Sequence, residues 1–132
     1  MESEKTYRVM VVDDNDDVRR LLRKVLEAAG HEVVEVADGE GAISRVEESV
    51  PDLVLMDIRL PGGMDGLETT SRLKEDPRLK RVPIIALTAS VMERDRQQAV
   101  AAGCSGFIGK PVDVATLPDL VKKFIARGPA SH

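Results

Sequence analysis

A single aspartate, Asp57, stands at the point where a predicted buried strand gives way to a loop. The residues just before it, 53–56, are all apolar, which is typical of a strand buried on both faces in the middle of a parallel sheet. Pro61, Gly62 and Gly63 follow, and these residue types favour a loop. Ligands of open parallel sheets bind at the carboxyl ends of the strands, so Asp57 lies where chemistry is expected.

Other polar side chains follow predicted strands in the same way. They are Asp13, Asp14, Thr88 and Lys110, which come after strands predicted at 7–12, 83–87 and 105–109. The carboxyl ends of parallel strands meet at one edge of a sheet, so these residues should converge on Asp57. The sequence therefore predicts a cluster of carboxylates, a hydroxyl and an ammonium group.

Such a cluster suits metal-assisted phosphoryl transfer. Neighbouring carboxylates repel one another and titrate as a coupled set unless a cation compensates them. An all-oxygen site suits Mg²⁺ and would also accept Mn²⁺, and Mg²⁺ keeps coordination positions open for phosphate oxygens. Asp57 is the natural carboxylate nucleophile, whereas Thr88 and Lys110 would bind the phosphoryl oxygens.

Each of these residues also has an ordinary structural interpretation. Asp13 and Asp14 are of a type that caps helices and forms turns, and Asp57 is too. A lysine such as Lys110 is usually solvated. Their joint occurrence, each at a separate strand end, favours a site. The acidic run is not a calcium-binding EF-hand loop, because the sixth position counted from Asp13 is Val18 rather than glycine.

Predicted strands and helices alternate along the chain. Glu32 and Glu35 interrupt the strand predicted at 32–36, which favours a position at the edge of the sheet. The helix predicted at 91–102 is mostly polar, so we expect it to be the most weakly anchored one. The other helices are predicted between Asn15 and Gly30, at 40–48, at 67–74, and from Thr116 to the residue before Gly128. This alternation predicts a parallel sheet with helices on both faces.

The composition is that of one globular domain. Of the 132 residues, 42% are hydrophobic and 32% are charged. A net charge of −4 and an aromatic content of 2% argue against direct nucleic-acid binding, which needs a basic face and, for single strands, stacking aromatics. No apolar run approaches the roughly 20 residues of a membrane span, and the charged N-terminus is not a signal peptide. The single Cys104, in an apolar context, predicts a buried thiol and a reducing, cytoplasmic location.

The chain resembles the response-regulator receiver domain of two-component signalling, a module also found alone in the chemotaxis regulator CheY. The resemblance spans about 7–126 and depends on motifs that occur in the family's order and spacing. They are the acidic pair Asp13-Asp14, Asp57 after an apolar strand, Pro61, Met64-Asp65-Gly66, Thr88-Ala89 and Lys110-Pro111. The resemblance implies a flavodoxin-like, CheY-like doubly wound α/β fold with strand order 2-1-3-4-5. It also implies a receiver domain at 7–127, with short tails at 1–6 and 128–132.

The resemblance assigns a role to each acidic residue. Asp57 would accept a phosphoryl group from a phosphohistidine of a sensor histidine kinase or a histidine phosphotransfer protein. Asp14, Asp57 and the backbone carbonyl of Arg59 would bind Mg²⁺ directly, whereas Asp13 would act largely through water. These assignments turn the predicted cluster into a phosphoacceptor site.

The resemblance also implies a switch. Thr88 and Lys110 would contact the phosphoryl oxygens, and the Lys110-Pro111 peptide bond would be cis. Phe107 falls at the family's switch aromatic, whose ring would turn inward when Thr88 moves toward the phosphate. The surface of the predicted elements 91–102, 105–109 and 116–127 would then change. The alternative for Phe107 is an ordinary aromatic of an edge strand.

The β-strand–helix loop after Asp57 departs from the family pattern. The family usually has one residue fewer between Pro61 and the Met-Asp-Gly motif, so Gly62-Gly63 should widen this loop. Ala89 is small and should leave the phosphoryl group open to water, while Arg59 and Ser90 would tune its lifetime.

We therefore expect a phosphorylation-dependent switch of the single-domain type that acts on a downstream protein partner, as a monomer or a phosphorylation-dependent dimer. It would catalyse only its own phosphorylation and dephosphorylation. One alternative is an aspartyl-phosphate phosphohydrolase, but such enzymes usually carry an acid/base Asp two residues after the nucleophile, where this chain has Arg59. Another is a receiver module excised from a hybrid histidine kinase.

Overall fold

The computed structural model describes residues 6–60, 62–89 and 92–127. Five strands alternate with five α-helices, as the sequence predicts. The strands are β1 (Arg8–Val12), β2 (Glu32–Val36), β3 (Leu53–Asp57), β4 (Ile84–Thr88) and β5 (Gly106–Gly109). The helices are α1 (Asp16–Ala28), α2 (Gly39–Glu48), α3 (Gly66–Lys74), α4 (Glu93–Ala102) and α5 (Leu117–Arg127), with a 3₁₀ turn η1 at Pro77–Leu79.

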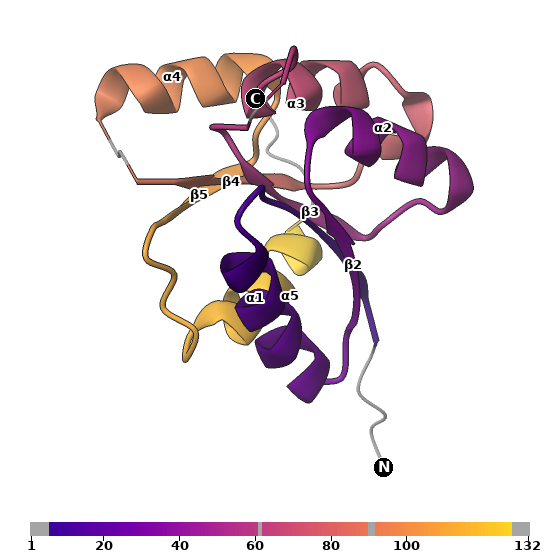
Figure 1. The fold of residues 1–132 in the computed structure, drawn as a ribbon, viewed down its shortest axis with the longest axis vertical. Coiled ribbons are helices and arrows are strands. Elements are labelled where there is room, and N and C mark those ends of the chain that lie inside the picture. The colour runs from indigo at the N-terminus through magenta and orange to yellow at the C-terminus, as the bar shows by residue number, and fades with distance from the viewer. Residues whose placement is uncertain (1–5, 61, 90–91, 128–132) are drawn as a thin grey trace.

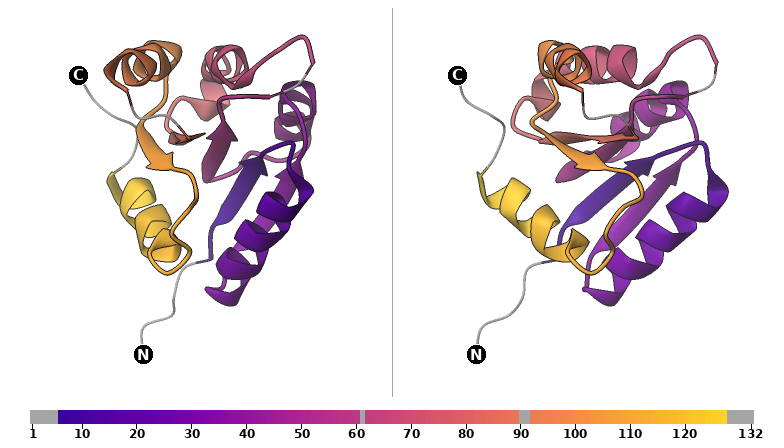
Figure 2. Two further views of the ribbon diagram at one scale, coloured as in Figure 1. Left: turned by 60° about the vertical axis from the view of Figure 1, so that its left-hand side comes forward. Right: turned by 90° about the vertical axis from the view of Figure 1, so that its left-hand side faces the viewer.

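All the strands are parallel, in the order β2-β1-β3-β4-β5. Helices α1 and α5 cover one face of the sheet, and α2, α3 and α4 cover the other (Figure 1). Figure 2 shows α4 and α5 on opposite sides of β5. The predicted strand order and the doubly wound fold are confirmed. None of the described helices is long and apolar enough to cross a membrane.

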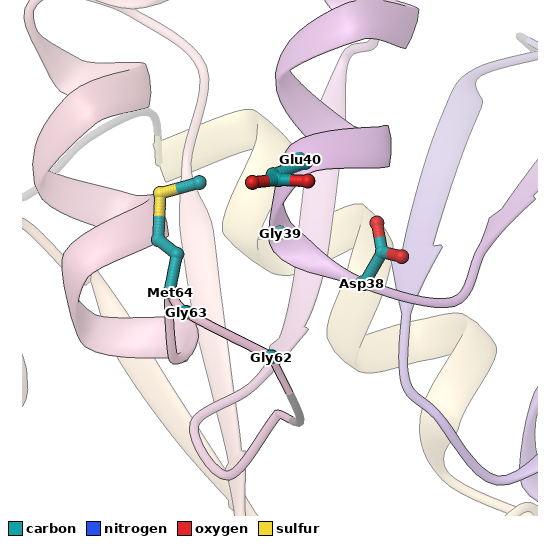
Figure 3. Close-up of a pocket in the computed structure, with 6 residues that line it drawn as sticks. All are labelled: Asp38, Gly39, Glu40, Gly62, Gly63 and Met64. Carbon is teal, nitrogen blue, oxygen red and sulfur yellow. The ribbon is translucent and has the colours of Figure 1, made fainter.

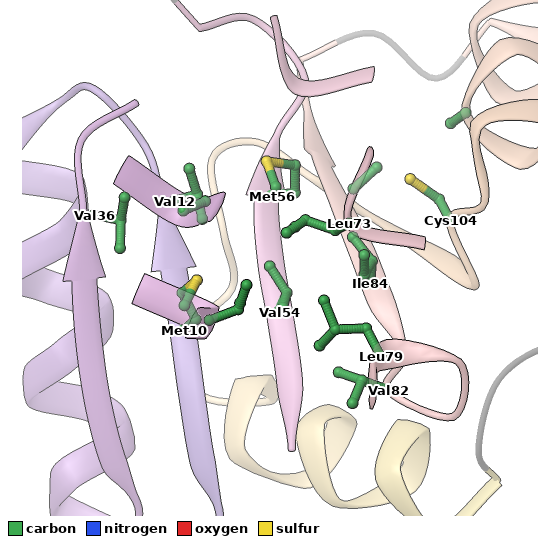
Figure 4. Close-up of a cluster of buried hydrophobic side chains, with 14 residues drawn as sticks. Met10, Val12, Val36, Val54, Met56, Leu73, Leu79, Val82, Ile84 and Cys104 are labelled. Atoms are coloured by element: carbon green, nitrogen blue, oxygen red, sulfur yellow. The ribbon is translucent and has the colours of Figure 1, made fainter. Parts of the chain in front are cut away.

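All five residues of the central strand β3 are buried. Successive side chains of a strand point to opposite faces of the sheet, and helices cover both faces here (Figure 1). Val54 and Met56 pack in a cluster with residues of α2, α3 and α4, part of which is drawn in Figure 4. Leu53 and Leu55 pack in a second cluster with residues of α1 and α5. Two apolar layers therefore hold the strand that carries Asp57.

Strand β2 lies at the edge of the sheet and pairs only with β1 in the described structure. Its glutamates are partly solvated and form ion pairs across the surface. Glu32 lies 3.4 Å from the guanidinium of Arg8, and Glu35 lies 2.9 Å from that of Arg23. The edge position predicted from these two glutamates is confirmed.

Helices α2 and α3 begin one residue earlier than predicted because each has an aspartate as its N-cap. The side chain of Asp38 accepts the N–H of Gly41 at 2.7 Å. The side chain of Asp65 accepts the N–H of Glu68 at 2.9 Å. Such caps satisfy backbone donors that the first turn leaves unpaired.

Other predicted boundaries differ by one or two residues. Strands β1, β4 and β5 each begin one residue later than predicted. Strand β4 includes Thr88, since the carbonyl of Thr88 accepts the N–H of Lys110 at 2.8 Å and extends the pairing. Helix α5 begins after Thr116, whose carbonyl accepts the N–H of Leu120 at 3.0 Å. Helix α4 begins at Glu93, and the start predicted at Val91 lies outside the described residues.

Helix α4 buries little of its surface, as its polar sequence predicts. Of its residues only Ala99 is buried, whereas Val100 is 47% exposed. Its Arg96 guanidinium lies 5.4 Å from the ring centre of Phe107 in β5. Cys104, just after the helix, is buried as expected, and burial raises the pKa of its thiol to about 11. This thiol is therefore a packing group rather than a nucleophile.

The burial of β3 predicts a large loss of stability when its side chains are shortened. We expect Leu55→Ala to lower the free energy of unfolding by about 2–5 kcal/mol, because it removes fully buried methyl groups and leaves a cavity. Leu21→Ala, at a position 48% exposed, should cost only about 0.5 kcal/mol. Urea denaturation followed by circular dichroism would measure both losses. Equal losses would contradict the packing described here.

Candidate functional site

The structure brings the three predicted aspartates together at the carboxyl edge of the sheet. Oxygen atoms of Asp13, Asp14 and Asp57 all lie within 4.8 Å of one another. Asp13 and Asp57 are buried, whereas Asp14 is exposed. Asp13 follows β1 and Asp57 ends β3, and these two strands are neighbours in the sheet. The topology therefore creates the carboxylate cluster.

Lys110 reaches this cluster from the end of β5. Its ammonium donates to Oδ2 of Asp13 at 2.8 Å and to Oδ2 of Asp57 at 3.1 Å. Burial opposes the charged form of Lys110, but the hydrogen bonds and the charges of these two carboxylates outweigh it and raise the pKa of the ammonium. One fixed positive charge thus offsets part of the repulsion between two buried carboxylates.

The Asp57 carboxylate is held through both of its oxygens. Oδ1 accepts the backbone N–H of Arg59 at 2.9 Å, and Oδ2 accepts the Lys110 ammonium. Burial raises the pKa of the Asp57 carboxyl; the bonds from Arg59 and Lys110 oppose this rise, and the charge of Asp13 adds to it. The contact with Asp57 involves the N–H of Arg59. The binding of Mg²⁺ by the Arg59 carbonyl stays a prediction.

The loop after β1 fixes Asp13 from several sides. Its Oδ1 accepts the N–H of Asn15 at 2.9 Å, and its own N–H donates to the carbonyl of Val36 at 3.0 Å. Both oxygens of Asp13 therefore have protein partners, since Oδ2 accepts from Lys110. Asp14 makes no side-chain hydrogen bond within the described ranges, which leaves its oxygens open to an ion or water.

The donor set of this cluster fits Mg²⁺. Oxygens bound to one Mg²⁺ at about 2.0–2.1 Å lie at most about 4.2 Å apart, close to the separation in the structure. Carboxylates and a nearby backbone are the hard oxygen ligands that Mg²⁺ prefers. Asp13, Asp14 and Asp57 each offer a carboxylate oxygen to such an ion, and the direct roles assigned to Asp14 and Asp57 stay predictions.

The predicted switch residues lie on the neighbouring strands. Thr88 is the buried last residue of β4 and lies opposite Gly109 of β5. Phe107 pairs with Ala86 and is partly buried against the cluster of α2, α3 and α4. The Lys110-Pro111 peptide bond is cis. Ser90 lies outside the described residues.

A family model of the response regulator receiver domain matches residues 9–122. This chain belongs to that family. It is 38% identical over 120 residues to the polar-differentiation response regulator DivK of Brucella ovis, covering 91% of this chain and 97% of DivK. The fold of this receiver domain also resembles the chemotaxis response regulator CheY4 of Vibrio cholerae, with a TM-score of 0.85 and 28% identity over 90% of this chain and 98% of that one.

A second solved structure bears on the metal. The receiver domain of the sensor histidine kinase PA1611 from Pseudomonas aeruginosa has a magnesium ion coordinated in its active-site cleft. Its TM-score to this receiver domain is 0.84, with 33% identity over 92% of this chain and 99% of that one. Membership of the family also means that the chain is a signalling module rather than a classical enzyme.

Gly66 supports the site in a way that the sequence did not reveal. A Cβ atom at Gly66 would lie 2.1 Å from the carbonyl oxygen of Asp57, so only glycine allows α3 to start so close to β3. The N–H of Gly66 donates to the carbonyl of Ile58 at 3.2 Å. The Met64-Asp65-Gly66 motif marked this position, but its spacing gave no sign of the contact with Asp57.

The loop with the additional glycine borders a cavity of about 180 Å³. Figure 3 shows it between the start of α2 and the loop that leads to α3. Gly62 has a φ of 91°, a left-handed conformation that glycine adopts readily. Pro61 lies outside the described residues. The residues lining the cavity are Asp38, Gly39, Glu40, Gly62, Gly63 and Met64.

The raised pKa of Asp57 predicts that its charge costs stability. A carboxyl whose pKa is higher in the folded than in the unfolded state makes folding less favourable as the pH rises through the interval between the two values, so the cost is absent at low pH and grows above 3.8. We expect Asp57→Asn to raise the melting temperature at pH 7 in EDTA by roughly 2–6 °C, on the order of 1 kcal/mol. The difference should shrink as the pH falls toward 3.8, the ordinary value for Asp.

Calorimetry with and without Mg²⁺ would test this. Mg²⁺ should raise the melting temperature of the wild type and have little effect on Asp57→Asn. Asp119→Asn, which removes an exposed carboxylate from α5, is the matched control and should change little. An Asp57→Asn protein that melts below the wild type at pH 7 would contradict the electrostatic account.

Proposed function

We propose that this receiver domain is a phosphorylation-activated switch of a two-component phosphorelay. Asp57 accepts a phosphoryl group from a phosphohistidine on a sensor histidine kinase or a histidine phosphotransfer protein. The observation that carries the proposal is the ammonium of Lys110, held between the carboxylates of Asp13 and Asp57 beside the open carboxylate of Asp14. This arrangement gathers the charges that phosphoryl transfer requires.

In the transfer step a carboxylate oxygen of Asp57 forms a bond to phosphorus while the bond from phosphorus to the histidine nitrogen breaks. The imidazole leaves with the electron pair of that bond. Hydrogen bonds from Lys110 and the Arg59 N–H favour the ionised, nucleophilic form of Asp57. Asp14, Asp57 and the carbonyl of Arg59 would hold Mg²⁺, which would neutralise charge on the phosphoryl oxygens.

The transferred group then needs partners of its own. Lys110 can follow the phosphoryl oxygens, because its ammonium already lies 3.1 Å from Asp57. The Thr88 hydroxyl, at the end of the neighbouring strand β4, binds another oxygen, and the ring of Phe107 turns toward the space it leaves. This motion changes the α4–β5–α5 face, where a downstream protein partner binds.

An apolar groove beside the site suits the phosphodonor. It has a volume of about 380 Å³ and lies between α1 and the segment after β5. Leu21 is 48% exposed on this surface. A donor helix seated there would hold its phosphohistidine next to Asp57. The groove is lined by Val18, Leu21, Leu22, Lys110, Pro111 and Val112.

We assign the receiver domain to residues 7–127, with tails at 1–6 and 128–132, and place its phosphorelay in the cytoplasm. It acts as a monomer or as a phosphorylation-dependent dimer. The similar receiver domain of PA1611 belongs to a sensor histidine kinase and holds magnesium in its active-site cleft, so the proposal applies equally to a receiver module within a larger kinase.

Labelling with a small phosphodonor tests the proposal. We expect incubation with acetyl phosphate and Mg²⁺ to add one hydroxylamine-labile phosphoryl group, because a carboxylate is the acceptor. Asp57→Asn should abolish the label, and EDTA should reduce it at least tenfold. Intact-protein mass spectrometry would measure the gain of mass. A label that persists undiminished in Asp57→Asn would refute the assignment. Many turnovers of small phosphate esters per protein would instead reveal a phosphohydrolase.

The groove makes a separate prediction about protein donors. Leu21→Glu should slow phosphotransfer from the histidine kinase that reacts fastest with the wild type by about tenfold, because it places a charge where an apolar helix docks. Labelling by acetyl phosphate should stay at the wild-type rate, since the small donor needs no docking surface. A parallel loss with both donors would contradict a docking role for the groove.

A further inference from the structure

The β1–α1 loop, residues 13–15, carries two of the site's carboxylates. Asp14 is exposed and makes no side-chain hydrogen bond in the part of the chain that is described, so the path of the backbone decides where its oxygens lie. Asp13 precedes it and contributes a buried carboxylate. Whatever fixes this loop therefore decides whether Mg²⁺ meets its ligands already in place.

Arg19, one turn into α1, contacts the first residue of the loop and the first residue of its own helix. One terminal nitrogen of its guanidinium donates to the backbone carbonyl of Asp13, and the other donates to the carboxylate of Asp16. The two contacts lie on either side of Asp14 in the chain. Only 12% of the Arg19 side chain is exposed, which is unusual for a charged group at a helix surface.

The guanidinium is itself anchored to the sheet. Its Nε donates to the carboxylate of Glu35 in β2 at 3.3 Å, and Arg23 donates to the other oxygen of Glu35 at 2.9 Å. The bond from Arg23 is the main reason that the pKa of Glu35 is lowered; burial opposes it, and the bond from Arg19 adds to it. The planar donor fork of Arg19 thus links the loop to an ionised, fixed acceptor on a neighbouring strand.

We propose that Arg19 is a positioning residue that preorganises the Asp13–Asp14 loop for Mg²⁺ by joining the Asp13 carbonyl, the Asp16 carboxylate and Glu35. The inference rests on the proposed function, because it assumes that these aspartates serve a Mg²⁺-dependent phosphoacceptor. The hydrogen bonds of Arg19 go to Glu35, the Asp13 carbonyl and Asp16, and not to the carboxylates of Asp14 and Asp57. Arg19 acts through the backbone that orients Asp14.

Electrostatics alone makes the opposite prediction. Arg19 is a cation near a cation site, so removing its charge should tighten Mg²⁺ binding. Loss of positioning should weaken it. Arg23 provides a matched control. It lies on the same helix as Arg19 and also pairs with Glu35, but it makes no hydrogen bond to the β1–α1 loop. The sign of the change in affinity therefore separates the two effects.

The experiment compares Mg²⁺ binding by isothermal titration calorimetry in the wild type, Arg19→Ala, Arg19→Lys and Arg23→Ala. We expect Arg19→Ala to raise the Kd for Mg²⁺ about tenfold, as removal of an outer contact to metal ligands commonly does. Arg23→Ala should keep the wild-type Kd or lower it slightly. Arg19→Lys should fall in between, because one ammonium cannot reach all three acceptors in the geometry of the guanidinium.

Labelling by acetyl phosphate provides the second readout. At Mg²⁺ concentrations far above its Kd, Arg19→Ala should regain the wild-type rate, because the defect is in metal affinity rather than in chemistry. If Arg19→Ala does not fold, Arg19→Lys carries the test: weaker Mg²⁺ binding supports the proposal, and wild-type affinity overturns it.

Two results would overturn the role of Arg19. One is an Arg19→Ala protein that binds Mg²⁺ as tightly as the wild type or more tightly, and the other is an equal weakening in Arg23→Ala. The proposed function fails separately, if the wild type binds Mg²⁺ but takes no phosphoryl label. In that case the affinities still report on whether Arg19 positions the loop.

Discussion

The repulsion between buried carboxylates at one edge of the sheet is the constraint on which the site depends. Asp13 and Asp57 are both almost fully removed from water, and each carries a charge that burial disfavours. Lys110 compensates only part of this negative charge, because its single ammonium is shared between two carboxylates and Asp14 adds a third carboxylate. Under the proposed function, this unbalanced negative charge would favour a divalent cation and, with it, a phosphoryl group.

The doubly wound fold supplies this cluster from distant parts of the chain. Lys110 and Asp13 are 97 residues apart, yet their charged groups lie within hydrogen-bond distance. The strand order places β1 beside β3 and leaves β4 between β3 and β5, so the lysine reaches back past Thr88 to the carboxylates. Apolar layers on both faces of β3 prevent Asp57 from retreating from its neighbours. Packing thus holds charges together that would separate in water.

Much of this could be predicted from the sequence, because it depends on where apolar runs stop. Asp13, Asp57 and Lys110 each end such a run, and parallel topology brings strand ends together. Contacts between residues that are distant in sequence and do not lie at strand ends could not be predicted in this way. Helical periodicity places Arg19 on α1 but does not reveal Glu35 as its partner. The glycine at position 66 likewise does not reveal its close approach to the backbone of Asp57. The one-residue shifts at helix starts arose because side-chain caps, rather than apolar spacing, decide where a helix begins.

The difference in exposure among the aspartates explains how one site can be both rigid and exchangeable. Asp13 and Asp57 are fixed by backbone N–H groups and by Lys110, so they need no reorganisation when charge arrives. Asp14 is exposed, so in the proposed function an ion and a phosphodonor would reach the buried pair from its side. A fully exposed set of carboxylates would be screened by water and salt. The loop between β1 and α1 reconciles the two demands, since its backbone is anchored while its central side chain stays open.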